Sequence, residues 1–88
     1  MTYRIQRLLA ADAVLFALSG ELDDEHADRL RALLAAETED RILLDLEDVT
    51  LVSHEAVRFL ARVEAMGIRI ANCPAYVRSW IAAENAGW

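Results

Sequence analysis

The sequence predicts an α/β domain in which a mixed sheet of about four strands has helices packed against it, in the order β-β-α-β-α-β-α. Apolar runs of strand length alternate with longer segments in which apolar residues recur at helical spacing. Residues suited to capping helices stand between these segments. Hydrophobic residues make up 56% of the 88 residues, which is enough for one core, so residues 1–88 are expected to form one domain.

The first two apolar runs are typical of an antiparallel hairpin. Residues 3–9 alternate apolar and polar side chains, as an edge strand with one solvated face does. Residues 11–13 form the expected turn. Residues 14–18 are almost continuously apolar and predict a strand covered on both faces, which Ser19 and Gly20 close.

A helix is expected next, capped by Asp23 or Asp24 and running to about Glu37. Its apolar face would carry Ala27, Leu30, Leu33 and Leu34. Residues 41–46 then predict a central strand parallel to the preceding one, because a helix separates the two. Residues 47–52 are expected to form a loop.

Two more helices flank the last predicted strand, residues 68–71. Ser53 is a suitable N-cap for the first of them, and Gly67 would end it. The apolar stripe of this helix would consist of Ala56, Phe59, Leu60, Val63 and Met66. Pro74 occupies the expected first position of the final helix. The core side of that helix would carry Val77, Trp80 and Ile81.

The charge pattern excludes several classes of function. The formal net charge is −6, and all nine cations are arginines interspersed among 15 carboxylates, so nucleic acids and anionic membranes are disfavoured partners. Residues 1–9 lack the apolar run of a signal peptide, and no segment has the length and hydrophobicity needed for membrane insertion. The single cysteine fits a reducing compartment, and a cytoplasmic location is expected.

Few residues suggest catalysis or cofactor binding. His26, His54 and Cys73 fall in three different segments, without the paired spacing of a metal site. Cys73 is expected to be a small buried hydrophobe rather than a nucleophile that a histidine activates. The three glycines form no phosphate-binding motif. We therefore predict no enzymatic activity, no metal and no cofactor.

The most informative segment begins the second predicted helix, from Thr50 to Glu55. A helix N-terminus presents unpaired backbone amides and a partial positive charge, so it suits an anionic group. From its position, Glu55 either complements the helix dipole or contacts a partner. The sequence is compatible with both interpretations.

Several strings of the sequence resemble a STAS domain of the anti-sigma factor antagonist type. They are residues 14–23, residues 41–46 followed by Val49 and Thr50, and residues 71–77. The resemblance spans nearly the whole chain and implies a STAS-like fold and a bacterial protein-interaction module for transcription regulation and signalling. The implied partner is a cytosolic regulatory protein, for which an anti-sigma factor kinase is a candidate.

The chain departs from this family at the switch loop. The family loop typically reads Asp-Ser-Ser-Gly, and a partner kinase phosphorylates the second serine. Aligned on Thr50, this chain reads Ser53-His54-Glu55-Ala56, so Glu55 takes the position of the family phosphoserine. A carboxylate carries about one charge against about −1.5 to −2 for phosphate, and a kinase cannot switch it. His54 is either a pH-sensitive group or an exposed histidine without a role.

The resemblance and the helix start together predict one docking surface, formed by the turn after Gly20 and by the second helix. Its predicted residues are Asp23, Asp24, Thr50, Ser53, His54, Glu55, Arg58 and Arg62. The alternative function is a small STAS subunit of a transporter, of the lipid-transport type, or of another larger complex.

The last helix offers a second candidate contact. Tyr76 and Trp80 cannot both face inward beside Val77 and Ile81 on so short a helix, so one aromatic ring is expected to stay partly exposed. That exposure reflects either packing alone or a contact with a partner or with a second copy in a homodimer.

Overall fold

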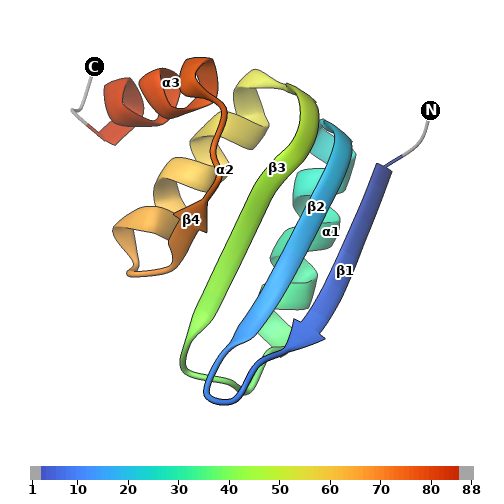
Figure 1. Cartoon of the computed structure of the whole chain (residues 1–88). Helices are drawn as coiled ribbons and strands as arrows, with labels where there is room; N and C mark the ends of the chain where they lie inside the picture. Colours follow the sequence, from blue (N-terminus) through green and yellow to red (C-terminus); the bar gives the residue numbers. More distant parts are fainter. Residues whose placement is uncertain (1–2, 86–88) are drawn as a thin grey trace.

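Within residues 3–85, which the computed structural model describes, four strands form one sheet in the order β1-β2-β3-β4, and three helices accompany it (Figure 1). Along the chain the elements are β1 (Tyr3–Leu9), β2 (Val14–Leu22), α1 (Asp24–Ala36), β3 (Ile42–Val52), α2 (His54–Ala65), β4 (Arg69–Ala71) and α3 (Ala75–Asn85). This arrangement confirms the predicted order, β-β-α-β-α-β-α.

The sheet is mixed. β1 and β2 pair antiparallel, with Ile5 opposite Leu18. β2 and β3 are parallel, and so are β3 and β4. The predicted hairpin and the predicted parallel central strand are therefore confirmed. Figure 1 shows α1 and α2 on the same side of the sheet, with α3 beside α2.

The core lies between the inner face of the sheet and the helices. Side chains alternate along a strand, and β2 directs Phe16 and Leu18 to the buried side. The helices contribute Leu30, Leu60 and Ile81, none of which has exposed surface. Burial of such a side chain contributes about 1.5–3 kcal/mol, so these contacts hold the helices on the sheet.

β2 and β3 are longer than predicted. The strand predicted for residues 14–18 continues to Leu22, and residues 47–52, predicted as a loop, form the second half of β3. The pairing register shifts twice along this extension, and Gly20 adopts a positive φ of 83° there. Such bulges let paired strands continue through polar residues, which a search for apolar runs does not reveal.

The prediction that residues 14–18 are covered on both faces is wrong. Leu15 lies on the face opposite Phe16 and is only half-buried. Its register partners are Leu8 of β1 and Leu43 of β3. Apolar neighbours on adjacent strands shield one another, so a continuous apolar run also suits a sheet that helices cover on one side.

Capping residues mark the helix starts and ends. The Asp23 carboxylate accepts a hydrogen bond from the backbone N–H of His26 (3.0 Å), which confirms it as the cap of α1. Gly67, with φ 101°, follows the C-cap residue of α2 as predicted. The carbonyl of Pro74 accepts from the N–H of Arg78 (2.9 Å), so the proline is the N-cap of α3 rather than its first helical residue.

Two apolar side chains that were predicted to face the core are exposed. Leu33 is 38% exposed and Met66 is 69% exposed. At about 100° of rotation per residue, each lies about a quarter turn from the centre of the buried stripe of its helix. Spacing alone overestimated the width of both buried stripes.

Arg7, near the end of β1, is joined to the C-cap residue of α1. Its Nε and Nη2 atoms donate hydrogen bonds to the two carboxylate oxygens of Glu37, at 2.7 and 3.0 Å. The backbone N–H groups of Thr38 and Glu39 also donate to Glu37. The hydrogen bond from Arg7 and these backbone bonds lower the pKa of Glu37 to about 2.

We expect Glu37→Gln to lower the free energy of unfolding at neutral pH. The pKa of Glu37 is about 2 in the folded chain and about 4.3 in an unfolded chain. The stabilisation is therefore fully present above about pH 4.3 and is lost as the pH falls towards 2. Urea unfolding at about pH 7, 5 and 3 should show the gap between wild type and variant narrowing towards low pH.

Asp12→Asn is the control for this experiment. Asp12 pairs with Arg41 through one contact of 3.1 Å, and both side chains are about three-quarters exposed, at 74% and 75%. Such a pair contributes little. Equal losses of stability in the two variants would contradict the role given to Glu37.

Candidate functional site

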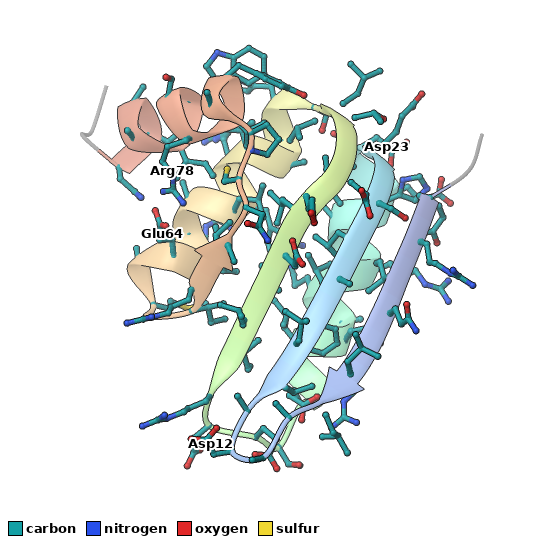
Figure 2. The ribbon with its side chains drawn as sticks, in the orientation of Figure 1. Asp12, Asp23, Glu64 and Arg78 are labelled. Atoms are coloured by element: carbon teal, nitrogen blue, oxygen red, sulfur yellow. The ribbon has the colours of Figure 1, made fainter. Side chains whose placement is uncertain are left out.

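Two helices begin side by side at the end of the sheet where β2 and β3 stop. Leu22 and Val52 are paired at the ends of these strands. The backbone N–H of Ser53 donates to the carbonyl oxygen of Leu22 at 2.9 Å. Figure 2 labels Asp23 at this end of the sheet and Asp12 at the opposite end. The fold thus brings together the turn and the helix start that the sequence analysis assigned to one surface.

The hydroxyl of Ser53 connects the two helix starts. Ser53 Oγ accepts a hydrogen bond from the backbone N–H of Ala56 (3.1 Å), which confirms Ser53 as the N-cap of α2. The same hydroxyl donates to Oδ1 of Asp24, the first residue of α1, at 2.8 Å. The hydroxyl proton and one lone pair of Ser53 are therefore both engaged in hydrogen bonds within the chain. The residue itself is half-buried.

Asp23 is held within its own turn. Its Oδ1 lies 3.1 Å from Nδ1 of His26, and that ring nitrogen is also 2.8 Å from the carbonyl oxygen of Glu21. The His26 ring stacks on Tyr3 of β1, with ring centroids 3.4 Å apart. His26 therefore orders the turn beside the predicted surface, whereas the sequence suggested it as a candidate metal ligand or as an activator of Cys73.

Glu55 extends into solvent from the first turn of α2. Its side chain is 60% exposed, and Oε1 lies 3.5 Å from Nη1 of Arg58, which is itself half exposed. An exposed pair at this distance contributes little to stability. The Glu55 carboxylate can therefore accept hydrogen bonds from another molecule without breaking a strong internal contact.

The remaining predicted surface residues lie on or near the same helix. Arg58 and Arg62 are exposed one and two turns after Glu55, on the side of α2 opposite its buried stripe. His54 is exposed in the first turn. Thr50 is exposed near the end of β3. At 1.5 Å of rise per residue, Arg62 lies about 10 Å along the helix from Glu55, so the surface extends beyond the helix start.

The last helix differs from its prediction in one residue. Val77 and Ile81 are fully buried, as expected, but Trp80 does not face the core and is 49% exposed. Tyr76 is 42% exposed, so both aromatic rings, rather than one, remain partly in solvent. The rings meet edge to face with centroids 5.4 Å apart. The cause is geometric, because the buried side of α3 holds only the Val77–Ile81 stripe.

Polar contacts hold α3 to the rest of the fold. The Tyr76 hydroxyl donates to the carbonyl oxygen of Thr50 at 3.0 Å. Nη1 of Arg78 lies 2.8 Å from both carboxylate oxygens of Glu64 on α2, and Figure 2 shows the two labelled residues facing each other. These contacts fix the position of α3 against α2 and the end of β3.

A hollow of about 320 Å³ lies between the start of α2 and α3. Its lining residues are Val52, His54, Val57, Trp80, Ala83 and Glu84. The hollow adjoins Glu55 through His54, so it borders the surface predicted from the sequence. The sequence predicted that one of Tyr76 and Trp80 would stay partly exposed, but it did not predict the hollow that Trp80 borders.

Cys73 is not in the environment of an activated nucleophile. Burial raises the pKa of the Cys73 thiol, which is the opposite of what an activated nucleophile needs. Among residues 3–85, no group of three or more His, Cys, Asp and Glu side chains is arranged to bind a metal ion. Of the helices in that range, none has both the length and the hydrophobicity to cross a membrane.

Solved structures share the fold of this chain. The unphosphorylated anti-sigma factor antagonist SpoIIAA matches with a TM-score of 0.69 and 21% identity, over 98% of this chain and 83% of that protein. An uncharacterized Shewanella loihica protein with a SpoIIAA-like fold matches with a TM-score of 0.55 and 18% identity, over 98% and 78%. Mglu matches with a TM-score of 0.60 and 26% identity, over 80% of this chain and 19% of Mglu.

These matches confirm the predicted STAS-like fold. No protein-family model matches the sequence, and no curated protein is significantly similar to it. At 18% and 21% identity, the two SpoIIAA-like structures establish the arrangement of strands and helices alone.

Proposed function

We propose that this chain is a non-enzymatic protein-interaction module of the anti-sigma factor antagonist type. In this proposal, residues 1–88 form one module that docks a regulatory partner through the adjoining starts of α1 and α2. The partner is a cytoplasmic protein, with an anti-sigma factor kinase as the first candidate. The fold shared with the antagonist SpoIIAA supports the class of function, and the function itself has to be argued from the site.

The observation that carries the proposal is the exposed Glu55 carboxylate beside a Ser53 hydroxyl that is already engaged. Glu55 stands at the position expected for the family phosphoserine, at a helix start that borders the cap of a second helix. A permanent negative charge there offers a partner one fixed acceptor group. Asp24, linked to Ser53, places a second carboxylate within the same surface.

The proposed module has no phosphorylation switch. Glu55 has no hydroxyl group. Phosphate transfer to Ser53 would remove the proton that its hydroxyl donates to Asp24 and would bring a dianion against the Asp24 carboxylate. The complex would then be controlled by the amounts of the two proteins rather than by covalent modification.

Site-specific photo-crosslinking in the native host tests the docking surface. A crosslinking side chain at position 55 is expected to capture one main partner, whereas the same group at Arg41, which is exposed at the opposite end of the sheet, is expected to capture little. Mass spectrometry identifies the partner. A transporter permease would favour the alternative function, and equal capture from both positions would contradict the proposed surface.

A kinase found in this way also tests the absence of a switch. After incubation with the kinase and ATP, the intact mass of the wild-type chain should stay unchanged. The variant Glu55→Ser, which supplies a hydroxyl at the family position, should gain one phosphate. A stoichiometric gain of one phosphate on Ser53 of the wild type would overturn the proposal.

A further inference from the structure

The hollow between α2 and α3 combines an apolar floor with an exposed indole wall. Val57 is buried and Val52 is half-buried at its base, while Trp80 is 49% exposed. Val77 and Ile81 already provide the core contacts of α3, and both are fully buried. The fold therefore does not need an indole at this position for packing. Partly exposed tryptophans bordering a concave site are typical of surfaces that anchor a partner side chain.

The end of the molecule that borders the hollow carries more carboxylates than arginines. We define the acidic end as the region where β2 and β3 stop and α1 and α2 start, together with Glu84 on the hollow. It holds four carboxylates within residues 21–25, then Glu55 and Glu84, against one arginine, Arg58.

The acidic end carries most of the net charge of the chain. Its six carboxylates and one arginine sum to −5, and the nine carboxylates and eight arginines elsewhere sum to −1. A focused charge of one sign selects partners of the opposite sign and speeds their approach. A second copy of this chain would bring either its own acidic end or a balanced surface, so it lacks this complementarity.

We propose that the hollow receives an apolar side chain from a basic helical segment of the partner, whose Arg or Lys residues pair with Glu55 and Glu84. The inference rests on the proposed docking function and adds the chemistry of the partner to it. Nε of Arg58 lies 3.9 Å from Oε1 of Glu84, a long contact that a better-placed cation can replace. Trp80 forms the apolar wall, and the two carboxylates set the charge that the segment must carry.

Two synthetic peptides test the proposal. Both form the same leucine-faced amphipathic helix, and one carries arginine where the other carries glutamate. In a Trp88→Phe background Trp80 is the sole tryptophan, so its fluorescence reports binding. The arginine peptide should bind, the glutamate peptide should not, and added salt should weaken the binding.

Two matched variants locate the peptide. Ala83 and Ala82 are neighbouring exposed residues of α3, and of the two only Ala83 lines the hollow. Ala83→Phe should fill the hollow and weaken binding of the arginine peptide by about tenfold or more, whereas Ala82→Phe should leave it unchanged. Both variants carry the same added ring on the same helix, so a general effect on folding would appear in both.

Each other outcome overturns the inference. Equal binding of the two peptides, no binding of the arginine peptide, or equal effects of the two alanine variants would do so. Self-association of the unliganded chain that Ala83→Phe abolishes would assign the hollow to a second copy instead. The proposed function fails on a different result, because it requires crosslinking from position 55 and involves no peptide.

Discussion

Glu55→Gln is expected to weaken binding of the crosslinked partner by about tenfold or more while changing the free energy of unfolding by less than about 1 kcal/mol. The small stability effect follows from exposure, because the carboxylate only complements the helix dipole and makes one long contact to Arg58. The large binding effect follows from desolvation, because a partner cation left unpaired at the interface costs more than about 1.4 kcal/mol. Titration and urea unfolding of each variant measure the two quantities.

Two companion variants delimit the surface. Arg62→Ala, two turns along the exposed side of α2, should also weaken capture. Asp28→Ala should not, because Asp28 lies on α1 and pairs there with Arg31 at 3.0 Å. Unchanged binding in all three variants, with normal unfolding curves, would mean that the docking surface lies elsewhere.

The order of elements was predictable because local chemistry marks their ends. Asp23 and Ser53 cap their helices with side-chain bonds to residues three positions ahead, and Gly67 ends α2 in a conformation that favours glycine. Each of these signals lies within a few residues of the feature that it specifies. These signals can therefore be recognised in the sequence without knowledge of the fold.

The second half of β3 was not predictable in the same way. Residues 47–52 begin with two carboxylates and look like a loop, yet they pair with the end of β2 through shifted registers. The pairing depends on a strand about 30 residues earlier in the chain. The strand or loop propensity of residues 47–52 does not reveal such a pairing partner, and pairing with a distant strand overrides that local propensity.

The residues of the candidate site could be proposed from the sequence, but the contacts between them could not. Glu55 and Ser53 were identified from a helix start and a family string. The hydrogen bond between Ser53 and Asp24 joins residues 29 positions apart and follows only from the fold. The hollow beside Trp80 was not predicted, because the sequence does not show which side of α3 packs against the rest of the fold. Val77 and Ile81 form that buried side, so Trp80 points away from it.

Leu60→Ala is expected to lower the free energy of unfolding by about 2–5 kcal/mol, a large share of the about 5–15 kcal/mol typical of a small domain. Leu60 has no exposed surface and lies in the middle of α2, the helix that presents Glu55 and Arg62. Its removal leaves a cavity between helix and sheet, because the surrounding side chains relax only partly.

Leu51→Ala is the matched control for Leu60→Ala. Leu51 is 60% exposed near the end of β3, so its truncation should change the free energy of unfolding by less than about 0.5 kcal/mol. Urea unfolding followed by circular dichroism compares the two variants. Equal losses would contradict the core described here. Leu60 is buried and cannot contact the partner, so its removal should weaken binding only by destabilising α2. At a low temperature where Leu60→Ala is folded, partner binding should therefore return to the wild-type level.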